Sequence, residues 1–89
     1  MEIRKVETDK KRYLDLLLLA DEQEDMVDRY LERGTMYVLE DDGVKAECVV
    51  TDENDGILEL KNIAVDPGFQ GKGYGKALVD FLIRTYAGR

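Results

Sequence analysis

Residues 69–78 read FQGKGYGKAL and place three glycines, Gly71, Gly73 and Gly75, directly before an apolar, helix-forming run. Glycine is the least favourable ordinary residue with which to begin a helix, so three of them require a cause. Successive glycine N–H groups at a helix N-terminus form a concave donor surface, where the helix dipole favours negative charge. The stretch predicts a phosphate or pyrophosphate site, and the alternative is a loop whose glycines serve only as turn residues.

The charges around these glycines favour the phosphate interpretation. Lys72 and Lys76 form a local cationic region in a chain whose net charge is -7. Two commoner phosphate motifs do not fit. A dinucleotide-binding GxGxxG needs glycine where Lys76 or Leu78 stands, and a Walker A loop needs lysine where Tyr74 follows Gly73. The sequence therefore predicts a phosphate loop of a different kind.

The strand predicted before the loop has an irregular alternation. Leu58 and Leu60 set one apolar face. Strict alternation from them would place Asn62 in the core and leave Ile63 and Val65 outside. One extra residue between Leu60 and Ile63, a β-bulge, restores the pattern and frees backbone N–H groups for a ligand. A strand buried on both faces near its end is the alternative.

The remaining sequence predicts one α+β domain. Residues 9–33 lack glycine and proline and have apolar residues at helical spacing. Asp21 and Glu24 resemble a capping box that divides this segment into two helices, and Gly34 is predicted to end the second helix in the C′ position. An apolar stripe after the loop predicts a third helix: Leu78, Phe81, Leu82 and Tyr86. The predicted strands are 2–6, 35–40, 44–51 and 57–65.

The order of elements is therefore β-α-α-β-β-β-α, with a mostly antiparallel sheet. Asp42-Gly43 predicts a hairpin turn of the primed kind, and residues 52–56 predict a second turn. One face of the strand 44–51 is expected to carry four small or apolar residues, Val44, Ala46, Cys48 and Val50.

Composition limits the functional classes. With 89 residues, 44% of them hydrophobic, residues 1–89 form a single small domain. The net charge of -7 argues against nucleic acid and anionic membranes as partners. A single cysteine, Cys48, and no histidine exclude an internal disulfide, a zinc cluster and a histidine-based triad, so no metal is predicted. Cys48 itself reads as a small core residue. The sequence predicts a cytoplasmic protein, because the run Leu16–Ala20 is too short to span a bilayer and the charged N-terminus is unlike a signal peptide.

The segment Gln70–Gly75, QGKGYG, matches the [QR]-x-x-G-x-[GA] signature of the GNAT superfamily of N-acetyltransferases. The preceding LKNIAVDP, residues 60–67, resembles that family's fourth strand and its exit. The order of elements agrees over essentially the whole chain. The resemblance implies the acyl-CoA N-acyltransferase (GNAT-like) fold with acetyl-CoA as cosubstrate.

The resemblance also implies where acetyl-CoA binds. The backbone amides of residues 70–76 would hold the pyrophosphate, and the bulged strand would pair with the pantetheine arm and present an N–H to the thioester oxygen. The implied cofactor-binding residues are Ile63, Ala64, Val65, Gln70, Gly71, Lys72, Gly73, Tyr74, Gly75 and Lys76. This assignment supplies one cause for both the glycines and the irregular strand.

Glu59 is the candidate catalytic base, because it occupies the strand position where some family members carry a catalytic glutamate. It lies four residues before Ile63, roughly 13 Å at about 3.3 Å per residue, so a proton would pass through water. The alternative is a solvated carboxylate beside Lys61. The sequence names no proton donor.

The chain departs from the family pattern after the third main helix. Family members resemble this chain but continue with a further strand, a helix and usually a hairpin, so the domain is expected to be incomplete at its C-terminus, as a fragment or a short natural form. Without the neighbouring strand, the strand 57–65 would expose unpaired backbone groups. We expect either a homodimer through this edge or a longer molecule.

The leading hypothesis is an N-acetyltransferase that moves the acetyl group of acetyl-CoA to a primary amine of an acceptor. The alternative is a non-catalytic acyl-CoA-binding or regulatory module of the same fold. An acidic cluster in the first two helices either attracts a cationic amine or is a solvated helix face: Asp21, Glu22, Glu24, Asp25 and Asp28. A third hypothesis, a protein-interaction domain without a ligand, is supported by that acidic cluster alone.

Overall fold

The computed structural model describes residues 1–54 and 56–87. Its sheet is an antiparallel meander in the order β1-β2-β3-β4. The strands are β1 (Glu2–Val6), β2 (Thr35–Glu40), β3 (Val44–Asp52) and β4 (Leu58–Val65). The helices are α1 (Leu14–Ala20), α2 (Glu24–Asp28) and α3 (Tyr74–Thr85), with 3-10 turns η1 (Lys10–Tyr13) and η2 (Pro67–Phe69). The predicted α+β class and element order are confirmed.

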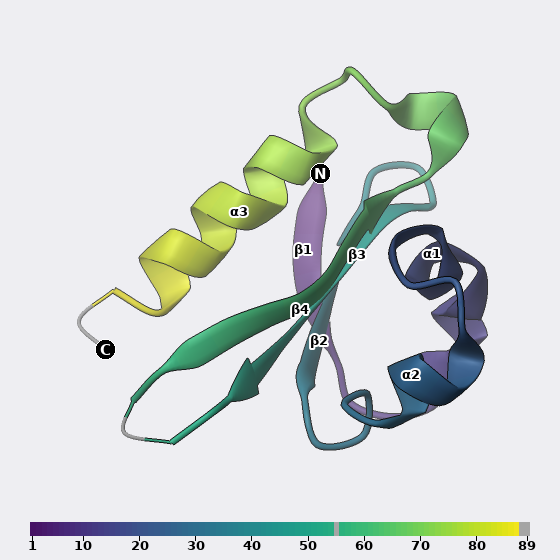
Figure 1. The fold of residues 1–89 in the computed structure, drawn as a ribbon. Coiled ribbons are helices and arrows are strands. Elements are labelled where there is room, and N and C mark those ends of the chain that lie inside the picture. The colour runs from purple at the N-terminus through teal and green to yellow at the C-terminus, as the bar shows by residue number, and fades with distance from the viewer. Residues whose placement is uncertain (55, 88–89) are drawn as a thin grey trace.

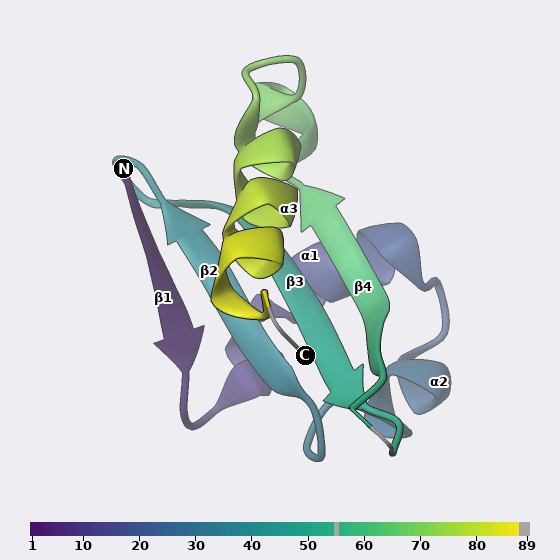
Figure 2. The same cartoon turned by 90° about the vertical axis from the view of Figure 1, so that its left-hand side faces the viewer.

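Helices cover both faces of the sheet. Figures 1 and 2 show α1 and α2 on one face and α3 on the other. The α1/α2 side has a core of eight buried residues: Val6, Leu17, Val27, Tyr30, Leu31, Met36, Val38 and Val49. The α3 side has a core of six: Tyr37, Leu39, Ala46, Cys48, Val50 and Leu78. Leu78, Phe81, Leu82 and Tyr86 pack there, which confirms the predicted apolar stripe of the third helix.

The predicted bulge in β4 is present. Val49 pairs with Asn62 and Val50 pairs with Leu60, so Lys61 has no partner on β3. Beyond it, Ile63 and Val65 pack against the α3 core, as expected. The alternative also holds in part, because the bulge turns Asn62 and Ala64 to the α1 side, where they are 3% and 8% exposed. A bulge and burial of both faces therefore occur together.

A second bulge overturns one prediction for β3. Leu39 pairs with Ala46 and Glu40 pairs with Val44, so Lys45 has no partner on β2. The extra residue reverses the phase of the strand between positions 44 and 46. Val44 therefore packs against the α1/α2 core, and only the other three predicted residues share the α3 face.

Two helix-end predictions were wrong. The helix α2 begins at Glu24 with Gln23 as its N-cap and no side-chain cap. The carboxylate of Asp21 instead accepts a hydrogen bond from the Tyr30 hydroxyl, at 3.2 Å, so the expected capping box does not form. Gly34 lies beyond the end of α2, and close packing explains the glycine, because a Cβ there would lie only 2.8 Å from Val49 Cγ1.

The turns agree with their sequence signals. Asp42 and Gly43 have φ values of 57° and 99°, the positive sign that primed turns require. In the second predicted turn, Asn54 and Gly56 also have positive φ, and Asp55 lies outside the described residues. Within residues 1–54 and 56–87, no helix is long and apolar enough to cross a bilayer.

One buried lysine joins the N-terminal segment to the turn after α2. The ammonium of Lys10 donates to the carbonyl oxygens of Leu31 at 2.9 Å, Glu32 at 3.4 Å and Gly34 at 2.7 Å. Its residue is only 9% exposed. The ammonium thus satisfies carbonyl groups that no helix or strand ladder reaches.

We expect Lys10→Met to lower the free energy of unfolding by roughly 1–3 kcal/mol, because it keeps the apolar stem but leaves buried carbonyls without a donor. Urea unfolding of both proteins measures the difference. Lys5→Met is the control, since Lys5 is exposed and lies 3.9 Å from Glu7 in a surface ion pair. Equal losses in the two variants would contradict this role for Lys10.

Candidate functional site

A cleft of about 530 Å³ lies where the end of β4 meets the glycine loop and the first turn of α3. Its lining residues are Leu19, Ile63, Ala64, Val65, Gln70, Gly71, Gly73, Tyr74, Gly75, Lys76 and Val79. Nine of the ten residues predicted to bind the cofactor are among them, and Lys72 is the exception. Sequence reasoning missed Leu19 and Val79, which no motif marks.

The three glycines of the loop have different structural causes. Gly71 and Gly73 have φ values of 82° and 86°, a conformation that favours glycine, and nothing would meet a Cβ at either position. Gly75 lies inside α3 without a positive φ, and a Cβ there would make an ordinary contact of 3.5 Å with Val65 Cγ2. Neither conformation nor packing requires glycine at position 75. The remaining explanation for glycine at this position is that a ligand approaches the start of the helix closely.

The β2–β3 connection and the start of β3 hold this loop in place. The Tyr74 hydroxyl donates to Asp41 Oδ2 at 2.7 Å, and this hydrogen bond is the main cause that raises the pKa of Tyr74. The ammonium of Lys45 lies 4.3 Å from the centroid of the Phe69 ring. The Asp66 backbone N–H donates to the carbonyl of Lys45 at 2.8 Å. The loop is therefore fixed at its entry, at its middle and at the start of α3.

The start of α3 can attract an anion. Gly73 is the N-cap and makes no side-chain cap, and the first turn has no acidic residue. Backbone N–H groups at such an end are available to a ligand, and the helix dipole adds positive potential. Lys76 forms an ion pair with Asp80 at 2.8 Å, so its charge is partly compensated. Backbone amides are thus the main anion-binding groups of the cleft.

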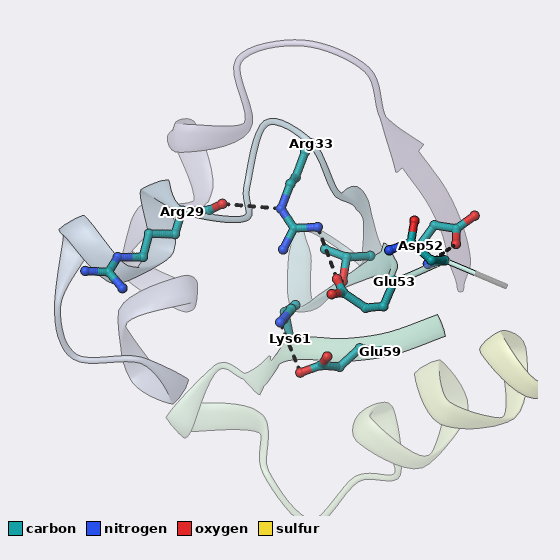
Figure 3. A network of polar contacts seen from close by, with 8 residues as sticks. Arg29, Arg33, Asp52, Glu53, Glu59 and Lys61 are labelled. Carbon is teal, nitrogen blue, oxygen red and sulfur yellow. Dashed lines mark hydrogen bonds and ion pairs between the residues drawn. The ribbon is translucent and has the colours of Figure 1, made fainter. Parts of the chain in front are cut away.

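Glu59 does not line this cleft. Its side chain is 52% exposed and forms an ion pair with Lys61 at 3.0 Å. Figure 3 shows this pair beside a second one, between Arg33 and Glu53, on the surface of β4 and the neighbouring turn. Glu59 pairs with Thr51 in the β3–β4 register and therefore lies on the α1/α2 face of the sheet.

A buried polar cluster lies on the same face, behind the cleft. The Asn62 amide donates to the Leu17 carbonyl and to the Tyr30 hydroxyl, both at 3.0 Å. Glu47 is 0% exposed. Neither of its carboxyl oxygens has a hydrogen-bond partner among the described residues, and the same is true of Asn62 Oδ1. The sequence analysis did not single out Glu47.

Cys48 lies next to this cluster along β3 but on the opposite face. It is 0% exposed, and burial raises the pKa of its thiol to about 12. A protonated, enclosed thiol is a poor nucleophile. The structure thus agrees with its interpretation as a core residue.

We expect stability to fall with rising pH because of Glu47. Burial raises the pKa of its carboxyl from 4.5 to about 8. Between these values the folded chain keeps a proton that the unfolded chain has lost, so the free energy of unfolding falls by up to about 1.4 kcal/mol per pH unit. Glu47→Gln should remove this dependence, which urea unfolding at pH 5, 6.5 and 8 measures.

The control is Glu2→Gln, which removes a carboxylate from an exposed position of β1. It should retain the wild-type pH dependence. A Glu47→Gln variant whose stability also falls in parallel with the wild type between pH 5 and 8 would show that this carboxyl is not the cause.

Known proteins resemble this chain in sequence and in fold. Residues 32–89 match the model of the acetyltransferase (GNAT) domain. An uncharacterized N-acetyltransferase of Bacillus subtilis, YvbK, is 45% identical over 74 residues, which are 82% of this chain and 47% of that protein. The chain thus spans about half the length of this curated relative.

Solved structures with the same fold include proteins with CoA bound. An acetyltransferase of Bacillus subtilis in complex with CoA has a TM-score of 0.85 and 39% identity, over 94% of this chain and 56% of that one. A GNAT family acetyltransferase of Elizabethkingia anophelis with acetyl-CoA bound has a TM-score of 0.88 and 30% identity, with the same coverage of 94% and 56%. An IAA acetyltransferase of Bacillus cereus has a TM-score of 0.84 and 34% identity, over 98% of this chain and 59% of that one.

Proposed function

Because the chain belongs to the GNAT acetyltransferase family, we propose that it binds acetyl-CoA in the cleft beside β4 and supports acetyl transfer to a primary amine. The observation that carries this proposal is the cleft itself, which combines the glycine loop, the uncapped start of α3 and the end of the bulged strand. Relatives of similar fold hold CoA or acetyl-CoA.

Each part of the cleft has a role in this proposal. The amides of residues 70–76 receive the pyrophosphate, where Gly71 and Gly73 give the backbone its positive φ and Gly75 leaves the helix start open. The residues Ile63 to Val65 receive the pantetheine arm along β4. Because β4 is the last strand in the order of the sheet, its outer N–H and C=O groups face away from β3 and can pair with an extended ligand.

The chemistry requires three groups: a neutral amine, a donor for the thioester oxygen and a proton for the departing thiolate. An N–H of the segment 63–65 is the proposed oxygen donor. As the amine nitrogen bonds to the acetyl carbon, the carbon–sulfur bond breaks with its electron pair on the sulfur. The nitrogen then loses a proton, and the thiolate takes up a proton from solvent water. We propose that Glu59 receives the amine proton through water, since its carboxylate is exposed on β4, where it forms an ion pair with Lys61.

We expect Gly75→Val to weaken CoA binding at least tenfold while the domain stays folded. The helix has ordinary conformation at position 75, so the β-branched side chain obstructs the phosphate approach with little backbone strain. Gly73→Val should also weaken binding, and in addition lower the melting temperature, because its φ is 86°. Calorimetry with CoA and a thermal melt separate the two effects.

The matched control for the glycine variants is Gly56→Val, since Gly56 has a φ of 77° but lies in the turn before β4, away from the cleft. It should lose stability and keep its CoA affinity. Dephospho-CoA should still bind the wild type, because the proposed contact is to the pyrophosphate. Unchanged CoA affinity in Gly75→Val would remove the loop from the binding site.

We expect Glu59→Gln to lower kcat by roughly 10²-fold, the usual contribution of a general base, without changing CoA affinity. Acetyl-CoA turnover against a panel of primary amines measures it. Glu53→Gln is the control, because Glu53 is in the neighbouring ion pair with Arg33 at 3.1 Å but has no proposed chemical role. Equal rates for Glu59→Gln and the wild type would reject Glu59 as the base.

The same assay separates the two functions that the sequence left open. CoA binding with turnover supports the transferase, whereas CoA binding without turnover of any amine supports the non-catalytic acyl-CoA-binding module. Absence of CoA binding by a folded chain at millimolar CoA would reject both.

A further inference from the structure

The structure has a second hollow, which the proposed function does not use. An apolar groove of about 210 Å³ lies between the first half of β4 and the C-terminal end of α3. Two of its side chains are large apolar groups left in water, since Leu60 is 44% exposed and Ile83 is 64% exposed. Ile57, directly before β4, is 61% exposed. Exposed apolar side chains that gather in one place mark a surface that binds another molecule. The lining residues of the groove are Val50, Leu58, Leu60, Leu82, Ile83 and Tyr86.

The backbone beside this groove also lacks a partner on one side. β4 is the last strand of the sheet, so within residues 1–54 and 56–87 no strand pairs with its outer edge. Figure 2 shows β4 at one outer edge of the sheet and β1 at the other. An open edge is a row of N–H and C=O groups that another strand can extend. Apolar side chains and open backbone groups thus occur together, and a β-strand with an apolar face matches both.

The opposite edge of the sheet does not have this combination. β1 carries Arg4 and Lys5, and both form ion pairs at the surface. Its large apolar residues are covered, since Ile3 is half-buried and Val6 is buried. Charged side chains, lysine above all, protect edge strands from pairing with other chains. The edge that is suited to pairing is therefore the edge of β4.

The charges of β4 determine which strand fits it. Glu59 and Lys61 flank Leu60 and form an ion pair at 3.0 Å, so their side chains lie on the same face of the strand. When two copies of this strand pair antiparallel with Leu60 at the centre, Glu59 of each copy lies opposite Lys61 of the other. The two-fold axis repeats this match and places the two Leu60 side chains next to each other. The strand is thus complementary to itself in charge and in apolar contact.

The bulge limits the length of such a pairing. Lys61 has no partner residue on β3, and the extra residue bends the strand and interrupts its alternation. A paired stretch centred on Leu60 therefore ends near Lys61 in each copy. The residues 63–65, which line the cleft, lie beyond the bulge and keep their outer edge open. One edge strand can therefore bind a second strand with its first half and a small ligand with its last residues.

We propose that the first half of β4 and the C-terminal end of α3 form a homodimer interface, in which two copies join their sheets by antiparallel β4–β4 pairing about a two-fold axis at Leu60. The groove residues Leu60 and Ile83 form the apolar part of the contact on the α3 face, and Glu59 and Lys61 form the charged part on the other face. The interface goes beyond the proposed function and does not depend on it, because the groove and the cleft have different lining residues.

The first experiment is sedimentation equilibrium of the wild-type chain from about 1 to about 100 µM. We expect a monomer–dimer equilibrium whose larger species has twice the monomer mass of 10.2 kDa. Leu60→Asp should weaken association at least tenfold, because it places two carboxylates side by side at the axis. Ile83→Asp should also weaken association. A wild type that stays monomeric, or that forms assemblies larger than a dimer, would overturn the proposal.

The matched control is Met26→Asp, which places the same charge on an exposed apolar residue of α2, 36% exposed and distant from β4 in sequence. It should associate as the wild type does. Circular dichroism shows whether each variant is folded. A folded Leu60→Asp variant that dimerises as strongly as Met26→Asp would also contradict the proposed interface.

The charge match is tested by exchanging the two residues. Lys61→Glu should weaken dimerisation several-fold, because two acidic side chains then face each other at both ends of the pairing. Adding Glu59→Lys to this variant should restore the affinity, since the opposite charges are again aligned across the axis. A double variant that associates as weakly as Lys61→Glu alone would show that the two residues do not face each other.

The last measurement needs only the wild-type chain, so it does not depend on whether a variant folds. Hydrogen exchange is followed at concentrations on either side of the dissociation constant found by sedimentation. The amides of residues 58–61 that point away from β3 should exchange more slowly at the higher concentration, because mass action favours the dimer. The amides of β1 should not change. Protection of residues 58–61 that is independent of concentration would assign the edge to another segment of the same chain and reject the second copy as its partner.

Discussion

The site depends on Lys61, the bulge residue of β4, which has no partner residue on β3. It shifts the phase of β4 by one position between Leu60 and Asn62. Without that shift, Asn62 would face the apolar α3 core, and its amide would lose the Leu17 carbonyl and the Tyr30 hydroxyl. Ile63 and Val65 would then leave the α3 core, against which they pack. A single inserted residue thus completes one core, builds the polar cluster on the other face and forms the strand wall of the cleft.

Fixing the position of α3 is the second requirement, because the anion-binding groups are at its first turn. The helix is held at both ends by phenol groups. Tyr74 donates to Asp41 at the start, and the Tyr86 and Tyr37 hydroxyls are 2.9 Å apart near the end. Between them Phe81 packs edge-on against Tyr37, with ring centroids 4.9 Å apart. Amides that bind a ligand through the backbone gain affinity from such rigidity, since no reorganisation follows binding.

The sequence predicted those features whose signals are local. The β4 bulge was predictable because polar Asn62 interrupts an apolar alternation. The loop was predictable because glycine is unfavourable at the start of a helix, so three glycines there indicate a structural or ligand-binding requirement. The bulge at Lys45 was not, because Val44 and Ala46 are both apolar and a phase change between them leaves no trace. The capping box failed because Asp21 has a tertiary partner, Tyr30, nine residues away. Glu47 was overlooked for a related reason: alternation places it opposite Ala46 and Cys48, and the outward face of β3 is buried only because α1 covers it.

The two faces of the sheet differ in the kind of polar group that they present. On the α3 side the ligand groups are backbone amides, which bind phosphate well but carry little information about an acceptor, because every residue has the same amide. On the α1 side the polar groups are side chains: Glu47 and Asn62 are buried, and the Tyr30 hydroxyl joins Asn62 to Asp21. Because β4 is the strand shared by both faces, its bulge aligns the two sets of groups along one edge. A ligand held by the loop amides and by the outer edge of β4 is bound through backbone groups, so side chains under α1 can change without removing any of those groups.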